Sequence, residues 1–206
     1  MDNIEQNKKN FLLEMLKQVP FSGWNEISIK HAAEALNWST PYVSLLFPNN
    51  IYDILNYFII HIDKNMLKDL EVTNLHSMKI SSRIYTIIQA RLNQNLIHRP
   101  AIAKMIYFCT LPQNTLYSLK TLWRTVDNIW FVCKDQSTDF NYYTKRLILS
   151  GVYSSTLLHW VNDFSENQIE TMEFLERRIN DALKIGTFKH SLKNKIQNIP
   201  FLRLLN

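Results

Sequence analysis

The sequence predicts an all-α fold, and three observations support that prediction. Of the 206 residues, 46% are hydrophobic and 20% are charged, so burial of apolar surface can offset the entropy lost when the chain becomes ordered. Three glycines and six prolines are too few for the turns of a β-sandwich or for glycine-rich phosphate loops. Apolar residues instead recur every three or four positions, which is the spacing of one helix face. A chain of this length forms one compact domain, with or without an appendage.

The N-terminal part of the chain predicts one helix followed by two short ones. The first helix, over residues 4–19, is expected to end at Pro20, because proline lacks the N–H that a helix interior needs. Ser28 is predicted to cap the next helix, and Asn37 to close it, since asparagine tolerates the left-handed conformation. Ser39 is predicted to cap a second short helix that ends at a Phe-Pro pair.

Longer helices follow, at residues 51–70, 81–95, 99–109, 112–133, 139–161 and 165–185. The helix at 112–133 carries an apolar seam that is predicted to be buried on one side: Leu116, Leu119, Trp123, Val126, Trp130 and Cys133. Residues 147–161 have no formal charge apart from His159. We expect this stretch either to be buried nearly all round or to pair with a second copy. Gly186 is predicted to end the last of these helices.

The net charge of +5 is confined to the C-terminal tail. Five cationic residues and no acidic ones follow Asp181, and the remaining 18 Lys and Arg equal the 18 Asp and Glu. Residues 187–206 are therefore predicted to form a basic amphipathic helix that binds an anionic membrane surface. Its membrane-binding residues are expected to be Phe188, Lys189, Leu192, Lys193, Lys195, Ile196 and Ile199. Alternatively, this apolar stripe packs on the domain or on a second subunit.

Two short helices and a tight turn precede the first long helix. Residues 29–39 read IKHAAEALNWS, and LLFP follows at 45–48. This pattern resembles the N-terminal unit of the TetR repressor family. Asn37 occupies the turn position at which those repressors usually have a glycine. The second short helix has no Arg, Lys, Asn or Gln to reach base edges. We therefore expect this helix-turn-helix motif to be an inherited packing unit, and we expect no DNA partner.

The most distinctive motif is DQSTDFNYYTKR at residues 135–146, with DNIW at 127–130 and FLERRINDA at 174–182. Together these runs resemble the coenzyme Q biosynthesis accessory protein family of mitochondria and α-proteobacteria, over roughly residues 11–186. The resemblance implies a TetR-like helical bundle with an N-terminal helix-turn-helix and a C-terminal amphipathic helix. It also implies an isoprenoid lipid held among the central helices, and assistance to the di-iron demethoxyubiquinone hydroxylase. Tyr142 departs from the family, in which relatives commonly carry Trp.

Large, adaptable apolar side chains lie on helices that are expected to converge, and the resemblance assigns them to a lipid site. The predicted lipid-binding residues are Met105, Phe108, Leu122, Trp123, Val126, Trp130, Phe140, Tyr143 and Leu147. Ordinary core packing is the alternative for each of them.

Two adjacent tyrosines stand beside two cations at the start of the helix at 139–161. Neighbouring positions on a helix point about 100° apart, so one of Tyr142 and Tyr143 is expected to face outward. With the resemblance added, the predicted partner-binding patch is Asp139, Asn141, Tyr142, Lys145 and Arg146. The alternative is that both tyrosines only cover their own helix.

The titratable residues do not predict an enzyme. The six histidines are scattered singly, and no Glu is followed three residues later by His, a pairing that a four-helix di-iron site needs twice. Cys109 and Cys133 lie on apolar stripes outside any zinc spacing and are expected to be small core residues. We expect no catalytic residue, no metal site and no cofactor.

These observations predict a helix-turn-helix-like unit at 1–50, a lipid-binding and dimerisation domain at 51–186, and a membrane-binding helix at 187–206. The expected function is that of a non-catalytic adaptor, acting as a homodimer, which presents a quinone precursor to the hydroxylase. The alternatives are a ligand-responsive transcription regulator of the TetR type and a membrane-surface scaffold without lipid. The expected location is the bacterial cytoplasm, peripheral on the inner membrane. If the protein is organellar, its presequence has been removed and it lies on the matrix side of the inner membrane.

Overall fold

The computed structural model describes residues 2–135 and 139–197, with side chains described over 3–135 and 141–184. Within these ranges the chain forms nine α-helices and no strand, which confirms the all-α prediction. The helices are α1 (Asp2–Ser22), α2 (Glu26–Ala35), α3 (Thr40–Leu46), α4 (Ile51–Leu70), α5 (Ile80–Asn93), α6 (Arg99–Thr110), α7 (Thr115–Val132), α8 (Asp139–Trp160) and α9 (Ile169–Gln197). Short 3-10 turns lie at Leu75–Ser77, Leu96–His98, Pro112–Asn114 and Glu166–Gln168.

The first helix is longer than predicted. α1 passes through Pro20 and continues to Ser22, so the expectation that Pro20 ends it was wrong. A proline removes only its own hydrogen bond, and the turn that follows it can remain helical. Gly23, at φ +80, ends the helix instead, and its N–H donates to the carbonyl of Val19 at 2.8 Å.

The helix-turn-helix is present, with a different cap from the one predicted. Asn25 caps α2, since its side-chain oxygen accepts from the backbone N–H groups of Ile27 and Ser28 at 3.0 and 3.1 Å. Ser28 lies inside the helix, and its hydroxyl donates to the carbonyl of Gly23 at 2.6 Å. Asn37 adopts the left-handed conformation as predicted, at φ 55. Ser39 occupies the N-cap of α3 without a side-chain capping bond.

The N-terminal unit is packed tightly onto the rest of the chain. The ring of Phe11 stacks on Trp38 at 6.0 Å and lies 5.5 Å from Phe47. Trp24 contacts Phe58 of α4 at 5.5 Å, and its indole N–H donates to the carbonyl of Ala101 in α6 at 2.9 Å. Buried side chains from α1 through α9 thus form one continuous core.

A buried polar network joins four helices in the interior. Arg91 of α5 pairs with Asp63 of α4, and its Nε donates to the hydroxyl of Tyr153 in α8 at 3.0 Å. Asn128 of α7 donates to the second carboxylate oxygen of Asp63 at 2.9 Å. Arg91 is 4% exposed, so the geometry of these helices is fixed by a charge pair shielded from water.

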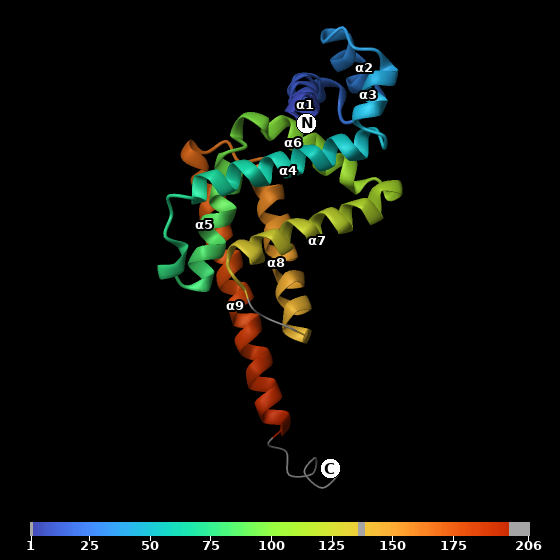
Figure 1. The fold of residues 1–206 in the computed structure, drawn as a ribbon. Coiled ribbons are helices and arrows are strands. Elements are labelled where there is room, and N and C mark those ends of the chain that lie inside the picture. Colours follow the sequence, from blue (N-terminus) through green and yellow to red (C-terminus); the bar gives the residue numbers. More distant parts are fainter. Residues whose placement is uncertain (1, 136–138, 198–206) are drawn as a thin grey trace.

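The C-terminal helices α8 and α9 lie side by side and extend away from the N-terminal unit (Figure 1). α9 runs without a break from Ile169 to Gln197, so the prediction that Gly186 ends it was wrong. A glycine permits the left-handed conformation that closes a helix but does not require it. The predicted membrane-binding side chains from Phe188 to Ile199 lie outside the described side chains. No helix in the described part of the chain combines the length and the hydropathy needed to cross a membrane.

Two predictions of burial needed correction. The seam of α7 is buried at Val126, Trp130 and Cys133, whereas Leu116 and Leu119 are 65% and 61% exposed. In Figure 1 the N-terminal end of α7 lies to one side of α8 and α9. Residues 147–161 are not buried all round, because Gly151, Leu147 and Leu158 are exposed. Pairing with a second copy therefore remains the open prediction for this face.

Candidate ligand-binding site and neighbouring surface

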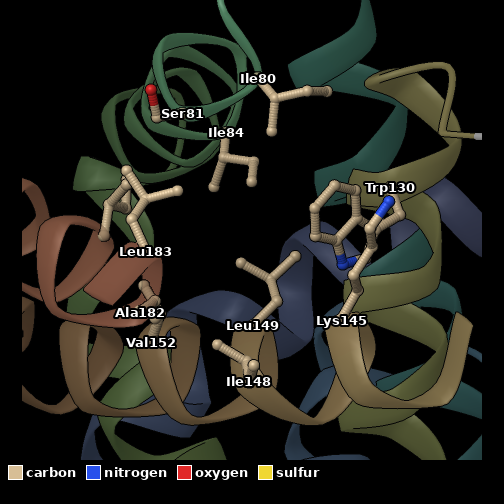
Figure 2. Close-up of a pocket in the computed structure, with 11 residues that line it drawn as sticks. Ile80, Ser81, Ile84, Trp130, Lys145, Ile148, Leu149, Val152, Ala182 and Leu183 are labelled. Carbon is tan, nitrogen blue, oxygen red and sulfur yellow. The ribbon is translucent and has the colours of Figure 1, made fainter. Parts of the chain in front are cut away.

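An apolar cavity of about 400 Å³ lies among α5, α7, α8 and α9 (Figure 2). Its wall is formed by Ile80, Ser81, Ile84, Trp130, Lys145, Ile148, Leu149, Val152, Ile179, Ala182 and Leu183. Side chains at positions i and i+4 point to the same side of a helix. Ile80 and Ile84 therefore both face the cavity from α5, and Ile179 and Leu183 both face it from α9. Because only Ser81 and Lys145 add a hydroxyl or a charge, the cavity suits a mainly hydrocarbon ligand.

The charged group of the cavity and the indole N–H of Trp130 lie at the end formed by α7 and α8, whereas the hydroxyl of Ser81 is supplied by α5 (Figure 2). Lys145 lies beside Trp130, with its ammonium nitrogen 5.3 Å from the ring centroid (Figure 2). The same nitrogen contacts a carboxylate oxygen of Asp135 at 2.7 Å. The indole Nε1 of Trp130 is buried and has no hydrogen-bond partner within the described part of the chain. This end therefore carries one paired charge and one unpaired donor.

Lys145 belongs to a four-residue ion cluster, which we call the α7–α8 cluster: Asp127, Asp135, Lys145 and Arg146. Arg146 donates from Nε to Asp127 at 2.5 Å and lies 3.7 Å from Asp135. Two carboxylates face two cations, so the formal charges of the cluster sum to zero. Arg146 is buried, and it therefore fixes α8 against α7 instead of presenting a free charge.

The residues predicted to bind lipid do not converge on this cavity. Of the predicted residues whose side chains the structure describes, only Trp130 lines it. Met105, Phe108 and Leu122 are half-buried against the core, and Phe108 packs on Tyr52 and Tyr117 at 5.8 and 6.2 Å. Val126 is fully buried in the core. α6 packs mainly on α1 and α7, and none of its residues is among those that line the cavity.

The other predicted lipid residues lie elsewhere. Tyr143 and Leu147 are 62% and 69% exposed on the surface of α8, and Trp123 is half-buried outside the cavity wall. The side chain of Phe140 lies outside the described residues. Sequence reasoning missed the contributions of α5 and α9 to the cavity. Their i, i+4 apolar pairs were visible in the sequence, but nothing there showed that these two helices pack together.

An exposed surface beside the cavity, which we call the aromatic patch, consists of Leu119, Trp123, Tyr143 and Leu147. The rings of Trp123 and Tyr143 lie 6.1 Å apart and join α7 to α8. Leu119 precedes Trp123 by four residues and Leu147 follows Tyr143 by four, so each leucine lies on the same helix face as the neighbouring ring. The outward tyrosine of the pair is thus Tyr143.

The predicted partner-binding residues have different environments. Tyr142 is half-buried, its hydroxyl donates to Asp127 at 3.0 Å, and the guanidinium of Arg146 lies 3.3 Å from its ring centroid. The hydrogen bond to Asp127 raises the pKa of Tyr142. Asn141 is exposed, whereas Lys145 and Arg146 are held in the α7–α8 cluster. The side chain of Asp139 lies outside the described residues.

The surface of α3 offers little chemistry for reading bases. Its exposed residues are Thr40, Pro41, Ser44 and Leu45. On α2, the exposed cation Lys30 lies 3.8 Å from Glu34. Base recognition usually relies on Arg, Lys, Asn or Gln together with cations on phosphate, and α3 exposes none of these side chains.

The cysteines and acids of the described residues form no obvious reactive centre. Cys133 is fully buried, as predicted, and burial raises the pKa of its thiol to about 12. Cys109 is half-buried, and burial raises the pKa of that thiol too. Over the part of the chain that the structure describes, no three His, Cys, Asp or Glu side chains are grouped to hold a metal ion.

These features define a helical protein of the TetR-like fold with a partly open apolar cavity among α5, α7, α8 and α9. The TetR transcriptional regulator from Nitrosomonas europaea ATCC 19718 has a similar structure, with a TM-score of 0.70 over 86% of this chain and 98% of that one. At 20% identity this similarity establishes the fold alone.

The family follows from sequence comparison. The COQ9 family model matches residues 115–186, the segment that contains α7, α8 and the cavity-lining part of α9. The ubiquinone biosynthesis protein coq9, mitochondrial, of Schizosaccharomyces pombe is 32% identical over 193 residues, covering 88% of this chain and 76% of that protein. The chain belongs to the COQ9 family, and the predicted resemblance is confirmed.

Animal relatives match across the same length of this chain. Ubiquinone biosynthesis protein COQ9, mitochondrial, is 29% identical in Rattus norvegicus and 28% identical in Homo sapiens, over 92% of this chain in both cases. The chain spans 63% of the rat protein and 62% of the human one.

Proposed function

We propose that this chain is a non-catalytic, lipid-binding accessory protein of ubiquinone biosynthesis. It binds an isoprenoid quinone precursor and presents it to the di-iron demethoxyubiquinone hydroxylase at a membrane surface. The apolar cavity is the observation that carries this proposal. Its volume of about 400 Å³ lies within the range of roughly 300–1,000 Å³ typical of small-molecule sites. The names of the COQ9 relatives supply the pathway.

The energetics favour a hydrocarbon ligand in this cavity. A lipid leaving the bilayer loses about 0.8 kcal/mol for each methylene that becomes exposed to water. Only an apolar wall can compensate for that loss, and the side chains of α5, α8 and α9 provide one. The surrounding helices can therefore shelter the reactive end of a lipid and part of its tail outside the membrane.

The aromatic patch is the proposed docking surface for the hydroxylase. It lies on the same two helices that supply Trp130 and Lys145 to the cavity. Exposed aromatic and aliphatic side chains that cluster in this way are typical anchors of protein interfaces. A partner bound here would stand next to the polar end of the cavity.

Two further parts of the proposal concern assembly. α8 exposes Gly151 and Leu158 on one face, and we assign that face to a homodimer interface that also includes α9. The basic tail at 187–206 is assigned to the membrane surface, where cations would meet anionic headgroups. The protein then acts as a peripheral protein at the inner membrane.

Gene deletion with quinone profiling tests the function. Loss of the gene in its native organism should cause the demethoxy quinone precursor to accumulate, and the wild-type gene should restore the normal profile. Ala182→Phe introduces a large ring at the cavity wall and should fail to restore it. Ala35→Phe places the same ring at an exposed position of α2 and should restore it fully. An unchanged quinone profile in the deletion strain would contradict the proposal.

A further inference from the structure

The unpaired indole N–H of Trp130 is an unusual feature for a cavity wall. Trp130 is 6% exposed, and its Nε1 has no acceptor within hydrogen-bond distance among the residues that the structure describes. A buried donor left without an acceptor is unfavourable, because it has lost its hydrogen bonds to water. The indole of Trp24, by comparison, donates to a backbone carbonyl, and that of Trp160 donates to Gln168. The described side chains therefore leave the indole N–H of Trp130 able to donate a hydrogen bond to a ligand.

The charge balance around this donor restricts what it can meet. Lys145 is the charged residue of the cavity wall, and its ammonium group is engaged by Asp135 at 2.7 Å. Arg146 is engaged by Asp127 and Asp135 in the same α7–α8 cluster. Because this cluster sums to zero charge, an anionic headgroup entering here would have to share these cations with the carboxylates already bound to them and would be repelled by those carboxylates. A neutral acceptor meets no such repulsion.

We propose that the cavity selects a neutral, largely apolar ligand that bears a carbonyl oxygen, and that the indole N–H of Trp130 donates a hydrogen bond to that oxygen. The ligand then lies with its carbonyl end at α7 and α8, and its hydrocarbon part runs along Ile84, Leu149 and Leu183 (Figure 2). This orientation places the oxygen-bearing end next to the aromatic patch. The inference rests on the proposed function, namely that the cavity binds a lipid.

Binding of three probes of equal chain length tests the inference: a straight-chain alkane, its methyl ketone and the corresponding carboxylate. Their affinities are measured by displacement of a fluorescent apolar dye from the full-length protein. A net hydrogen bond contributes about 0.5–1.5 kcal/mol, so the ketone should bind roughly 2- to 10-fold more tightly than the alkane. The carboxylate should bind no more tightly than the ketone. Trp130→Phe keeps an aromatic ring and removes the donor, so it should abolish the preference for ketone over alkane.

Trp38→Phe serves as the matched control, because Trp38 packs on Phe11 in the N-terminal unit and does not line the cavity, so its loss should leave the preference intact. A second measurement does not depend on the stability of the Trp130→Phe variant. In the wild-type protein labelled with ¹⁵N, the indole N–H signal of Trp130 should shift downfield on addition of the ketone and should not do so with the alkane. The signal is assigned in the wild-type protein from through-bond correlations that link each indole N–H to its own backbone.

The outcomes separate the two proposals. If no probe binds, the lipid-binding function fails and this inference fails with it. If the alkane binds and the ketone gains nothing over it, or if Trp130→Phe keeps the ketone preference, only the role of Trp130 is overturned. If the carboxylate is the tightest ligand, the requirement for a neutral ligand is wrong.

Discussion

Replacing Arg91 by leucine should destabilise the protein strongly. The substitution leaves Asp63 in the interior without its charged partner, and it also removes the donor to the hydroxyl of Tyr153. Breaking a buried ion pair from one side costs about 3–5 kcal/mol. For a chain of this size each kcal/mol lowers Tm by about 2–4 °C, so the expected loss is on the order of 6–20 °C.

Thermal and urea unfolding followed by circular dichroism measures this loss. The double variant Arg91→Leu with Asp63→Leu should recover part of it, because no buried charge is then left unpaired. The exposed pair of Arg177 and Glu173, 3.8 Å apart, provides the control, and Arg177→Leu should change the free energy of unfolding by less than about 1 kcal/mol. A loss for Arg91→Leu as small as that of the control would refute the structural role given to the buried network.

Three further predictions concern the α8–α9 connection, the aromatic patch and the tail. Burial acts to raise the pKa of Asp163, but hydrogen bonds from Ser165 and Thr171 outweigh it and hold that pKa below its ordinary value. A carboxyl with a lowered pKa stabilises the fold above its unfolded pKa of about 3.9 and loses that contribution as the pH falls further. Acid titration of the unfolding free energy should show this loss in the wild type and a smaller one in Asp163→Asn. Trp123→Ala and Tyr143→Ala should each weaken binding to the hydroxylase by about 10-fold or more in a surface-binding assay. Tyr107→Ala, at an exposed position of α6, should leave that binding unchanged. If the patch variants bind the hydroxylase as tightly as the wild type does, the patch is not the docking surface. Deletion of residues 187–206 should sharply reduce flotation with anionic liposomes. Undiminished flotation would show that the tail does not bind the membrane.

Local signals in the sequence placed the helices well, because they depend on nearby residues. Asn37 was recognised as a residue that can take a positive φ, and the structure has it at φ 55. Errors arose where two local signals competed. Pro20 and Gly186 both favour a helix end, yet in each case the chain continues as a helix, and Asn25 took the capping position expected for Ser28.

The ligand site was less predictable, because it depends on which helices pack together. Trp130 was predicted as a lining residue, and the structure places it in the wall of the cavity. Ile84 and Leu183 were missed because apolar periodicity shows that a helix has a buried face without showing its neighbour. Leu116 was predicted to be buried for the same reason, and the structure leaves it exposed.

The two surfaces of the site meet at the α7–α8 cluster. Arg146 stacks against the ring of Tyr142, whose neighbour Tyr143 belongs to the aromatic patch, while Lys145 faces the cavity. Adjacent residues of one helix thus belong to the patch and to the polar end of the cavity. This arrangement suits a protein that hands a bound molecule to a docked partner.

Organic extraction of the purified protein, followed by mass spectrometry, tests the central claim most directly. The wild-type protein should release an isoprenoid quinone or another long-chain lipid in an amount comparable to the protein itself. Ala182→Phe should release far less, and Ala35→Phe should match the wild type. A wild-type protein that is folded and releases no lipid would contradict the account.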